Sequence, residues 1–157
     1  MKKKTKNHEY WMKYAINLAK FSEKIGEVPI GSVLILNNKI IGEGFNSSIS
    51  YNDPTAHAEI ISLRNGAKKI KNYRILNSIL YVTLEPCLMC FGAILHSRIK
   101  TLVYGTKNYK RNVKEMNYLS FLSKFYKLNL ISGILELECS NLIKNFFVSK
   151  RKKKILL

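Results

Sequence analysis

Hydrophobic residues recur along this chain with two different periods, and the switches between them outline the secondary structure. Apolar residues at three- and four-residue spacing predict amphipathic helices, whereas short apolar runs bounded by turn residues predict strands. The helices predicted in this way are 8–24, about 54–66, 86–96, about 114–126 and about 136–150. The predicted strands are 31–36, 39–46, 78–84, 99–106 and about 128–134.

Turn and capping residues set several of these boundaries. Asn37-Asn38 separates the first two strands, which predicts a tight β-hairpin. Asp53-Pro54 is typical of a helix start, because an aspartate caps the first turn and the missing N–H of proline costs nothing there. Pro86 is expected to open the next helix in the same way. Strands that alternate with helices predict a layered α/β domain around a central mixed sheet.

The length and composition favour one ordinary globular domain. A chain of 157 residues, 46% of them hydrophobic, is long enough to bury its own core. We expect a single domain over 1–157, with a core at about 8–150 and a basic tail at about 150–157. The basic N-terminus is not followed by an apolar stretch, and no run approaches the length of a membrane span. With an odd number of cysteines, three, the expectation is a cytoplasmic chain with reduced thiols.

The net charge is strongly positive and has two explanations. The 27 basic and 10 acidic residues give a formal charge of +17, which favours a phosphate-rich partner because Lys and Arg neutralise phosphates. An AT-rich coding sequence, however, raises Lys, Asn and Ile together, and 22 of the basic residues are lysines. The cluster at 150–154 is equally consistent with a solvated tail. The charge alone therefore leaves both explanations open.

The candidate chemistry begins with the Cys87-x-x-Cys90 pair. One such pair is weak support for a metal site, since a zinc ribbon needs a second pair and the chain has none. His57 strengthens the case for a metal site, because it lies at the start of the helix that precedes the strand leading to the cysteines. One imidazole and two thiolates are zinc ligands, and three protein ligands leave the fourth tetrahedral position open. An open position is typical of a catalytic zinc site rather than a structural one.

The spacing of these residues agrees with that chemistry. Cys87 and Cys90 lie three positions apart at a helix start, so they share a face, and the helix N-terminus favours thiolates. Glu59 is two positions from His57 and is free to point at a zinc-bound water, whose pKa zinc lowers to roughly 7. A carboxylate there can collect and return protons. The remaining histidines, His8 and His96, and Cys139 are interpreted as structural.

The chain resembles a known family through these and other motifs. His57-x-Glu59 followed by Pro86-Cys87-x-x-Cys90 is the signature of the zinc-dependent nucleobase deaminases. The stretches HEYWM, EVPIGSVL, IGEGFN, NDPTAHAEI, NYRI, LYVTLEPCLMCFGA and HSRI closely resemble bacterial tRNA-specific adenosine deaminases. The resemblance is dense from about residue 8 to residue 106 and thinner afterwards.

The resemblance implies a fold, a reaction and partners. The expected fold is a cytidine-deaminase-like three-layer α/β/α sandwich with a five-stranded mixed sheet, assembled as a homodimer with one Zn²⁺ in each subunit. The implied reaction is hydrolytic deamination of the wobble adenosine, position 34 of the tRNA anticodon, to inosine. The implied substrate is the anticodon stem-loop of an arginine tRNA with the anticodon ACG, and the products are inosine and ammonia.

The resemblance also implies roles for individual residues. His57, Cys87 and Cys90 would hold the zinc ion. Glu59 would move protons between the attacking water, the purine N1 and the departing amine. Asn46 would hydrogen-bond the flipped-out nucleoside, although a turn asparagine explains it equally well.

Further residues match the family's contacts with the base and the RNA. The stretch 27–31, which includes Pro29 and Ile30, would line the base pocket. A basic, aromatic C-terminal helix would meet the anticodon loop by stacking and by phosphate pairing. The alternative for this helix is a pair of core phenylalanines followed by a frayed basic tail. The matching residues of the helix are Phe146, Phe147, Lys150 and Arg151.

Two other functions remain open from the sequence. A deaminase of free bases or nucleosides, of the guanine or cytosine type, would share the zinc chemistry. A non-catalytic RNA-binding protein with a structural zinc would have no use for Glu59. Activity on an anticodon stem-loop, compared with free adenosine and cytidine, separates the first alternative, and substitution of Glu59 separates the second.

The chain departs from the family pattern after the strand that ends near Gly105. Asn108 stands where the family usually has an aspartate, and the stretch 109–120 replaces a region rich in small residues. An asparagine can still accept a hydrogen bond from a ribose 2′-OH, but it lacks the negative charge that opposes nearby phosphates. We therefore expect weaker discrimination against deoxyribose than in the relatives. Asn108→Asp should increase the ratio of the deamination rates on matched RNA and DNA hairpins, and an unchanged ratio would contradict this expectation.

Overall fold

The computed structural model describes residues 7–108 and 120–155, with side chains placed up to residue 152. Its helices are α1 His8–Lys24, α2 Ser48–Tyr51, α3 Ala58–Ile70, α4 Leu88–His96 and α6 Glu136–Ile155. Residues 120–125 are also helical. Its strands are β1 Gly31–Leu36, β2 Lys39–Phe45, β3 Ile79–Leu84, β4 Thr101–Thr106 and β5 Asn129–Ser132. In this part of the chain no helix is both long and apolar enough to cross a membrane.

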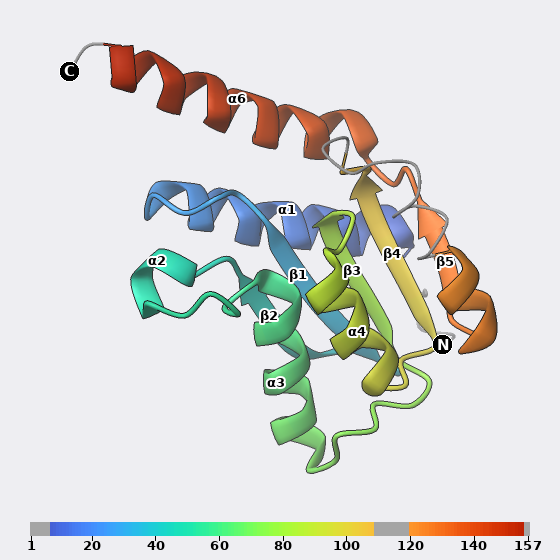
Figure 1. Cartoon of the computed structure of the whole chain (residues 1–157). Helices are drawn as coiled ribbons and strands as arrows, with labels where there is room; N and C mark the ends of the chain where they lie inside the picture. The colour runs from blue at the N-terminus through green and yellow to red at the C-terminus, as the bar shows by residue number, and fades with distance from the viewer. Residues whose placement is uncertain (1–6, 109–119, 156–157) are drawn as a thin grey trace, which may run out of the picture.

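The strands form one five-stranded mixed sheet in the order β2-β1-β3-β4-β5 (Figure 1). β1 pairs antiparallel with β2 and with β3, whereas β3, β4 and β5 are parallel. The β1–β2 hairpin closes over Asn37 and Asn38, which both adopt positive φ, 50° and 59°, as a two-residue hairpin turn requires. α4 connects the parallel strands β3 and β4, so its N-terminus lies at the carboxyl end of β3.

Helices cover both faces of the sheet and give the three-layer sandwich (Figure 1). One core lies beneath α3 and α4 and includes Leu34, Leu80 and Phe91. The other lies beneath α1 and α6 and includes Trp11 and Val33. Because neighbouring residues of a strand point to opposite faces, β1 contributes Leu34 to the first core and Val33 to the second. The expected cytidine-deaminase-like fold is confirmed in its layers and in its five strands.

β2 and α3 approach each other so closely that glycine is required between them. A Cβ atom placed on Gly44 would overlap the carbonyl oxygen of Ala58 and lie 2.7 Å from the amide nitrogen of Ser62. Gly42 faces the next turn of the same helix, where a Cβ would overlap the carbonyl oxygen of Ser62. The two glycines therefore set the position of α3, including its N-terminal end.

The sequence placed most elements correctly and the start of α3 wrongly. Asp53 does not begin a helix: its carboxylate accepts hydrogen bonds of 2.7 Å from both the backbone N–H and the hydroxyl of Thr55 and closes a local turn. His57 is still extended, with φ −78° and ψ 153°, so α3 begins at Ala58 and runs to Ile70. The short helix α2 was not predicted. The last helix reaches Ile155 instead of about residue 150, and the start of the helix expected near 114–126 lies outside the described residues.

A glycine pair tests the close approach of β2 and α3. Gly44→Ala should lower the free energy of unfolding by about 1–3 kcal/mol, because the added methyl group forces two backbone segments apart. Gly92→Ala is the matched control, since a Cβ there has no heavy atom within 4 Å and alanine favours a helix interior. Urea unfolding measures both variants. Equal stability of the two would contradict the requirement for glycine at position 44.

Candidate active site

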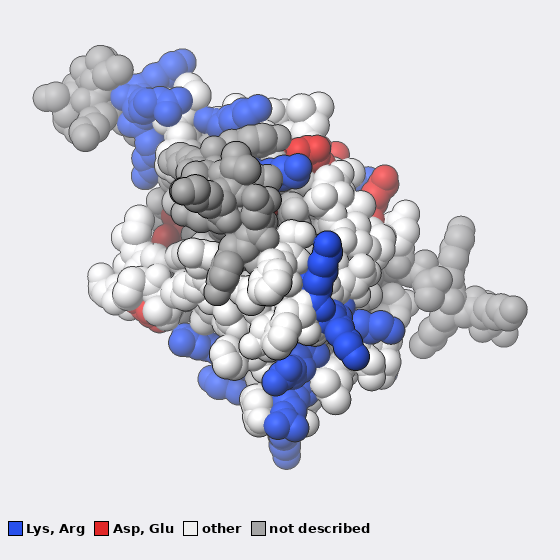
Figure 2. All heavy atoms as spheres, turned by 45° about the vertical axis from the view of Figure 1, so that its right-hand side comes forward, with Lys and Arg blue, Asp and Glu red and all other residues white. Residues whose placement is uncertain are grey.

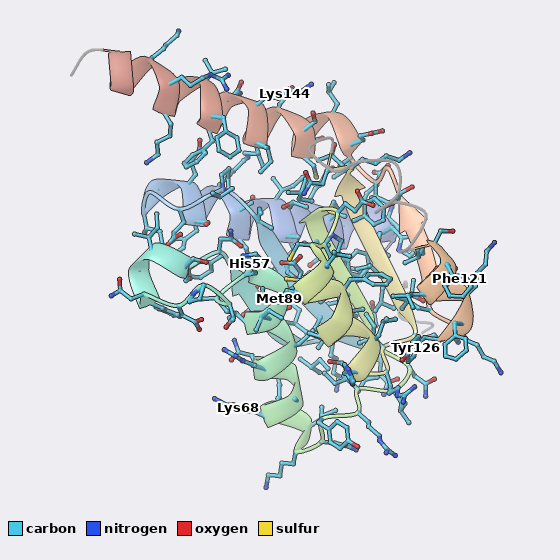
Figure 3. The ribbon with its side chains drawn as sticks, viewed as in Figure 1. His57, Lys68, Met89, Phe121, Tyr126 and Lys144 are labelled. Carbon is cyan, nitrogen blue, oxygen red and sulfur yellow. The ribbon has the colours of Figure 1, made fainter. Side chains whose placement is uncertain are left out.

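Three potential metal ligands meet where α3 and α4 begin. His57 is the N-cap residue of α3, Cys87 is the N-cap residue of α4, and Cys90 lies in the first turn of α4. The Nδ1 atom of His57 lies 3.6 Å from the Sγ atom of Cys87 and 3.4 Å from the Sγ atom of Cys90. Figure 3 shows His57 at the end of α3 that faces the start of α4. Residues 30 or more positions apart are thus brought into one cluster.

The geometry of this cluster fits a tetrahedral zinc ion. Zinc bonds of about 2.3 Å to sulfur and about 2.1 Å to nitrogen place the two ligand atoms about 3.6 Å apart. The two observed nitrogen–sulfur distances match that edge, and the three ligand atoms all lie within 4.8 Å of one another. His57, Cys87 and Cys90 are the only such group of three metal-ligating side chains in the described part of the chain. Three ligands leave room for a non-protein ligand.

The thiols already interact strongly within the protein. Hydrogen bonding to Cys90 and to His57 lowers the pKa of the Cys87 thiol to about 3. The same pairing, together with burial, raises the pKa of Cys90 well above its usual range, because one proton is shared between two sulfurs. The start of α4 contributes positive partial charge from its unpaired N–H groups. A bound divalent cation supplies the remaining charge that deprotonates both thiols.

Glu59 lies beside the cluster and is almost completely buried. It is 4% exposed and interacts electrostatically with Cys87 and His57. Burial raises the pKa of its carboxyl group to about 7. A carboxyl group of this kind accepts and donates protons readily near neutral pH. Because His57 is extended, Glu59 lies in the first turn of α3, and its role in proton transfer stays a prediction.

Asn46 joins the end of β2 to the start of α3. It is 7% exposed, and its Oδ1 atom accepts a hydrogen bond of 3.0 Å from the backbone N–H of Ala58. The hydroxyl of Ser22 donates to the backbone oxygens of both Asn46 and Val28, at 3.0 Å each. The side chain of Asn46 is thus fixed next to His57, and its Nδ2 group has no partner among the described protein groups.

Two buried glutamates outside the predicted site residues accept hydrogen bonds from the segments around the cluster. Glu27, 2% exposed, accepts hydrogen bonds from the backbone N–H and the hydroxyl of Ser50, at 2.7 and 2.9 Å, and so anchors α2. Glu85, 6% exposed, accepts a hydrogen bond of 3.0 Å from the backbone N–H of Asn108. The motifs EVPIG and TLEPC contain these glutamates, but only the fold reveals their partners.

A cavity of about 590 Å³ lies between α6 and the carboxyl ends of β3 and β4. Three of the predicted RNA-contacting residues line it, namely Asn108, Phe147 and Arg151. Lys107 and Lys144 add two further basic groups to the lining, and Lys144 lies on the same helix (Figure 3). Thr106 is a buried part of the lining, and its hydroxyl has no hydrogen-bond partner among residues 7–108 and 120–152. The lining is therefore mainly apolar and contains basic groups.

Other predicted contacts lie elsewhere. Val28 is the one residue of the stretch 27–31 that lines this cavity. Pro29 is buried, and the carbonyl oxygen of Ile30 accepts a hydrogen bond from the backbone N–H of Asn46 at 3.0 Å. The Nζ atom of Lys150 lies 5.3 Å from the ring centre of Phe146.

The other singled-out residues have surroundings that agree with a structural interpretation. Phe146 is 7% exposed, so it belongs to the core. Cys139 is fully buried, and His8 hydrogen-bonds the hydroxyl of Tyr81 at 2.9 Å. His96 ends α4 as expected. The altered stretch 109–120 lies outside the described residues except for its last position.

Comparison with known proteins agrees with this geometry. A sequence model of the cytidine and deoxycytidylate deaminase zinc-binding region matches residues 5–106, which contain all three ligands and Glu59. The chain belongs to the cytidine and deoxycytidylate deaminase family. The zinc-binding character of the matched region and the positions of His57, Cys87 and Cys90 together identify zinc as the metal of the site.

Individual relatives of the chain include tRNA adenosine deaminases and a guanine deaminase. The chain is 58% identical over 146 residues to the tRNA-specific adenosine deaminase of Buchnera aphidicola subsp. Baizongia pistaciae, covering 92% of this chain and 90% of that protein. A solved structure from work on A-to-I editing by tRNA:A34 deaminases is 35% identical, with a TM-score of 0.78, and covers 85% and 98% of the two chains. A guanine deaminase from Bacillus subtilis is 37% identical, with a TM-score of 0.65 over 76% of each chain.

The ligand set is tested by metal content. Cys90→Ala should lower the zinc content from about one ion per chain to near zero, because two remaining ligands bind zinc weakly. Cys139→Ala is the matched control: it removes a buried cysteine that takes no part in the cluster and should keep its zinc. Mass spectrometry of the purified proteins measures the metal. Full zinc content in the Cys90 variant would contradict the proposed ligand set.

Proposed function

We propose that this chain is a zinc-dependent hydrolase that deaminates the wobble adenosine, position 34, of a tRNA anticodon to inosine. The arginine tRNA with the anticodon ACG is the expected substrate. The observation that carries the proposal is the buried carboxyl group of Glu59 beside a three-ligand zinc site. The names of the relatives support the choice of adenosine in tRNA over a free base.

The residues of the site divide the reaction between them. His57, Cys87 and Cys90 would hold the zinc ion, which would supply Lewis acidity and lower the pKa of the attacking water. Glu59 would take one proton from the attacking water and deliver it to the purine N1. It would then take the proton of the new C6 hydroxyl and deliver it to the amine, so that ammonia leaves as the C6 carbonyl forms. The reaction is balanced, since adenosine and one water give inosine and ammonia. Burial of Glu59 keeps these transfers away from bulk solvent.

Asn46 and the loop before β1 would position the nucleoside. The Nδ2 group of Asn46 is available as a donor, while its Oδ1 atom is held by Ala58. Pro29 and Ile30 lie next to Asn46 in space, because the backbone N–H of Asn46 donates a hydrogen bond to the carbonyl oxygen of Ile30. We assign these residues to the walls of the base pocket. A target base must leave its stack to reach such a buried site.

The cavity beneath α6 is the proposed contact for the anticodon loop. Phe147 offers a ring for stacking, and Arg151 offers a charge for phosphate, both at the rim of one cavity. Asn108 lines the same cavity, where its backbone is held by Glu85. Lys150, which packs over Phe146, is assigned to phosphate contact at the outer end of α6.

We also propose a homodimer that acts in the cytoplasm. Leu88 and Met89 occupy the first turn of α4 next to the zinc ligands, yet they are 50% and 39% exposed. Ile49 and Tyr51 of α2 are 70% and 63% exposed. Adjacent exposed apolar residues are typical of interfaces, and a second copy would cover them. Light scattering of the zinc-loaded chain gives the mass that tests this assembly.

The function is tested on an ACG anticodon stem-loop, with deamination read by reverse transcription. The chain should convert the wobble adenosine, which is then copied as guanosine. Glu59→Ala should remain folded and zinc-loaded but lose about 10²- to 10⁴-fold in rate, because the proton transfers lose their acid and base. Glu138→Ala, an exposed glutamate on α6, is the control and should keep the wild-type rate.

The other outcomes are equally informative. A zinc-loaded chain that leaves the stem-loop unchanged but deaminates free guanine, cytosine or their nucleosides would contradict the proposal and favour a free-base enzyme. Stem-loop binding without any deamination, unaffected by Glu59→Ala, would favour a non-catalytic RNA-binding protein.

A further inference from the structure

A second cavity lies at the opposite end of the parallel strands. It has a volume of about 300 Å³ and is formed by the segments that precede β3, β4 and β5, together with the end of α4. β3 spans the six residues Ile79–Leu84, so about 20 Å of strand separates the two ends of the sheet. The cations of the cavity follow α4 or precede β5, at the end of the sheet away from His57 and Glu59.

The inner wall of this cavity is apolar and its rim is basic and aromatic. Arg98, Lys100 and Lys127 contribute three cations, and none of the lining residues is acidic. The guanidinium carbon of Arg98 lies 5.6 Å from the ring centre of Tyr126. The apolar wall consists of core side chains, which are Ile94, Leu95, Ile99 and Leu128.

Exposed aromatic side chains continue the rim onto the neighbouring helical segment. Phe121 and Phe125 are 65% and 73% exposed and lie four residues apart, which places them on one face of that segment. The rings of Phe125 and Tyr126 are 5.3 Å apart in an edge-to-face arrangement. Figure 3 shows Phe121 and Tyr126 on the side of the molecule away from His57. We call Arg98, Lys100, Phe121, Phe125, Tyr126 and Lys127 the aromatic–basic surface.

The charge around this surface is of one sign. From residue 60 to residue 84 the sequence contains no acidic residue, and from 86 to 135 it contains one, Glu115. Figure 2 shows Lys and Arg side chains gathered toward the bottom of this face, without Asp or Glu among them. Such a surface attracts a polyanion. A second copy of the chain is a poor occupant, because it would bring like charges together.

We propose that the aromatic–basic surface is a second nucleic-acid site, which binds single-stranded RNA without strong sequence preference. Exposed rings stack on successive bases, and flanking cations pair with the backbone phosphates. An acidic peptide or a lipid headgroup would pair with the cations and leave the rings without a stacking partner, whereas the bases of single-stranded RNA use both, so nucleic acid is the polyanion that fits best. The choice of RNA over DNA rests on the proposed function, whereas the site itself rests on the surface alone.

The test measures binding of a fluorescein-labelled oligouridylate of about ten nucleotides to the zinc-loaded chain by anisotropy. This probe has no adenosine, so its binding is independent of deamination, and failure of the proposed enzyme function leaves the result intact. Phe121→Ala and Phe125→Ala should each weaken binding about tenfold, because each removes a stacking ring. Phe125→Trp is the matched control and should bind like the wild type.

The cations are tested by the salt dependence of the same binding. The double variant Lys100→Ala/Lys127→Ala should reduce the slope of log K against log salt concentration by about 1.4, or about 0.7 for each lost phosphate contact. The double variant Lys100→Arg/Lys127→Arg keeps both charges and should keep the slope. All of these side chains are exposed, so the variants should fold and retain zinc.

A variant at the other cavity shows whether the site is separate. Arg151→Ala, beneath α6, should leave the oligouridylate affinity unchanged, and inorganic polyphosphate should bind equally to the wild type and the Phe125 variant. A loss of oligouridylate affinity in the Arg151 variant as large as in the phenylalanine variants would place the probe beneath α6 and overturn the proposal. Unchanged oligouridylate affinity in both phenylalanine variants would reduce the surface to a general polyanion patch and would also overturn it.

Discussion

The N-termini of two helices must lie close enough together to bind one metal ion, and several features of the fold hold them in that position. α3 and α4 belong to different connections of the sheet, yet their N-cap residues His57 and Cys87 lie close enough to share an ion. The glycines of β2 set the position of α3, and the β3–α4–β4 crossover sets that of α4. A shift of either helix by about 1 Å would lengthen the distance between the histidine nitrogen and the cysteine sulfurs beyond the value that a tetrahedral zinc ion requires.

The elements that could be predicted from the sequence are those with a clear hydrophobic period or a characteristic turn sequence. The bounds of α1 and the Asn37-Asn38 hairpin followed from local pattern, and the three ligands and Glu59 followed from residue type and spacing. The start of α3 did not, because Asp53 caps either a helix or a turn, and only tertiary packing decides between them. The anchoring by Glu27 and Glu85 was equally hidden, since a buried carboxylate is recognised by its partners and not by its neighbours in sequence.

The positive charge has a spatial organisation that composition alone could not reveal. One group of cations borders the cavity beneath α6 near the candidate active site, and another borders the cavity at the opposite end of the sheet. A uniform drift toward lysine would add charge everywhere, but it would not pair the cations with apolar cavities and exposed rings. The two locations therefore correspond to the two contacts that we propose, one with the anticodon loop beneath α6 and one with single-stranded RNA at the opposite end of the sheet.

The proposed reaction depends on an open three-ligand zinc site formed by His57, Cys87 and Cys90. X-ray absorption at the zinc edge distinguishes the ligands of this site, because sulfur and nitrogen neighbours differ in both distance and scattering. We expect two sulfur neighbours at about 2.3 Å and two lighter neighbours at about 2.0–2.1 Å, one of them the histidine nitrogen. A zinc ion surrounded by three or four sulfurs, or by none, would contradict it.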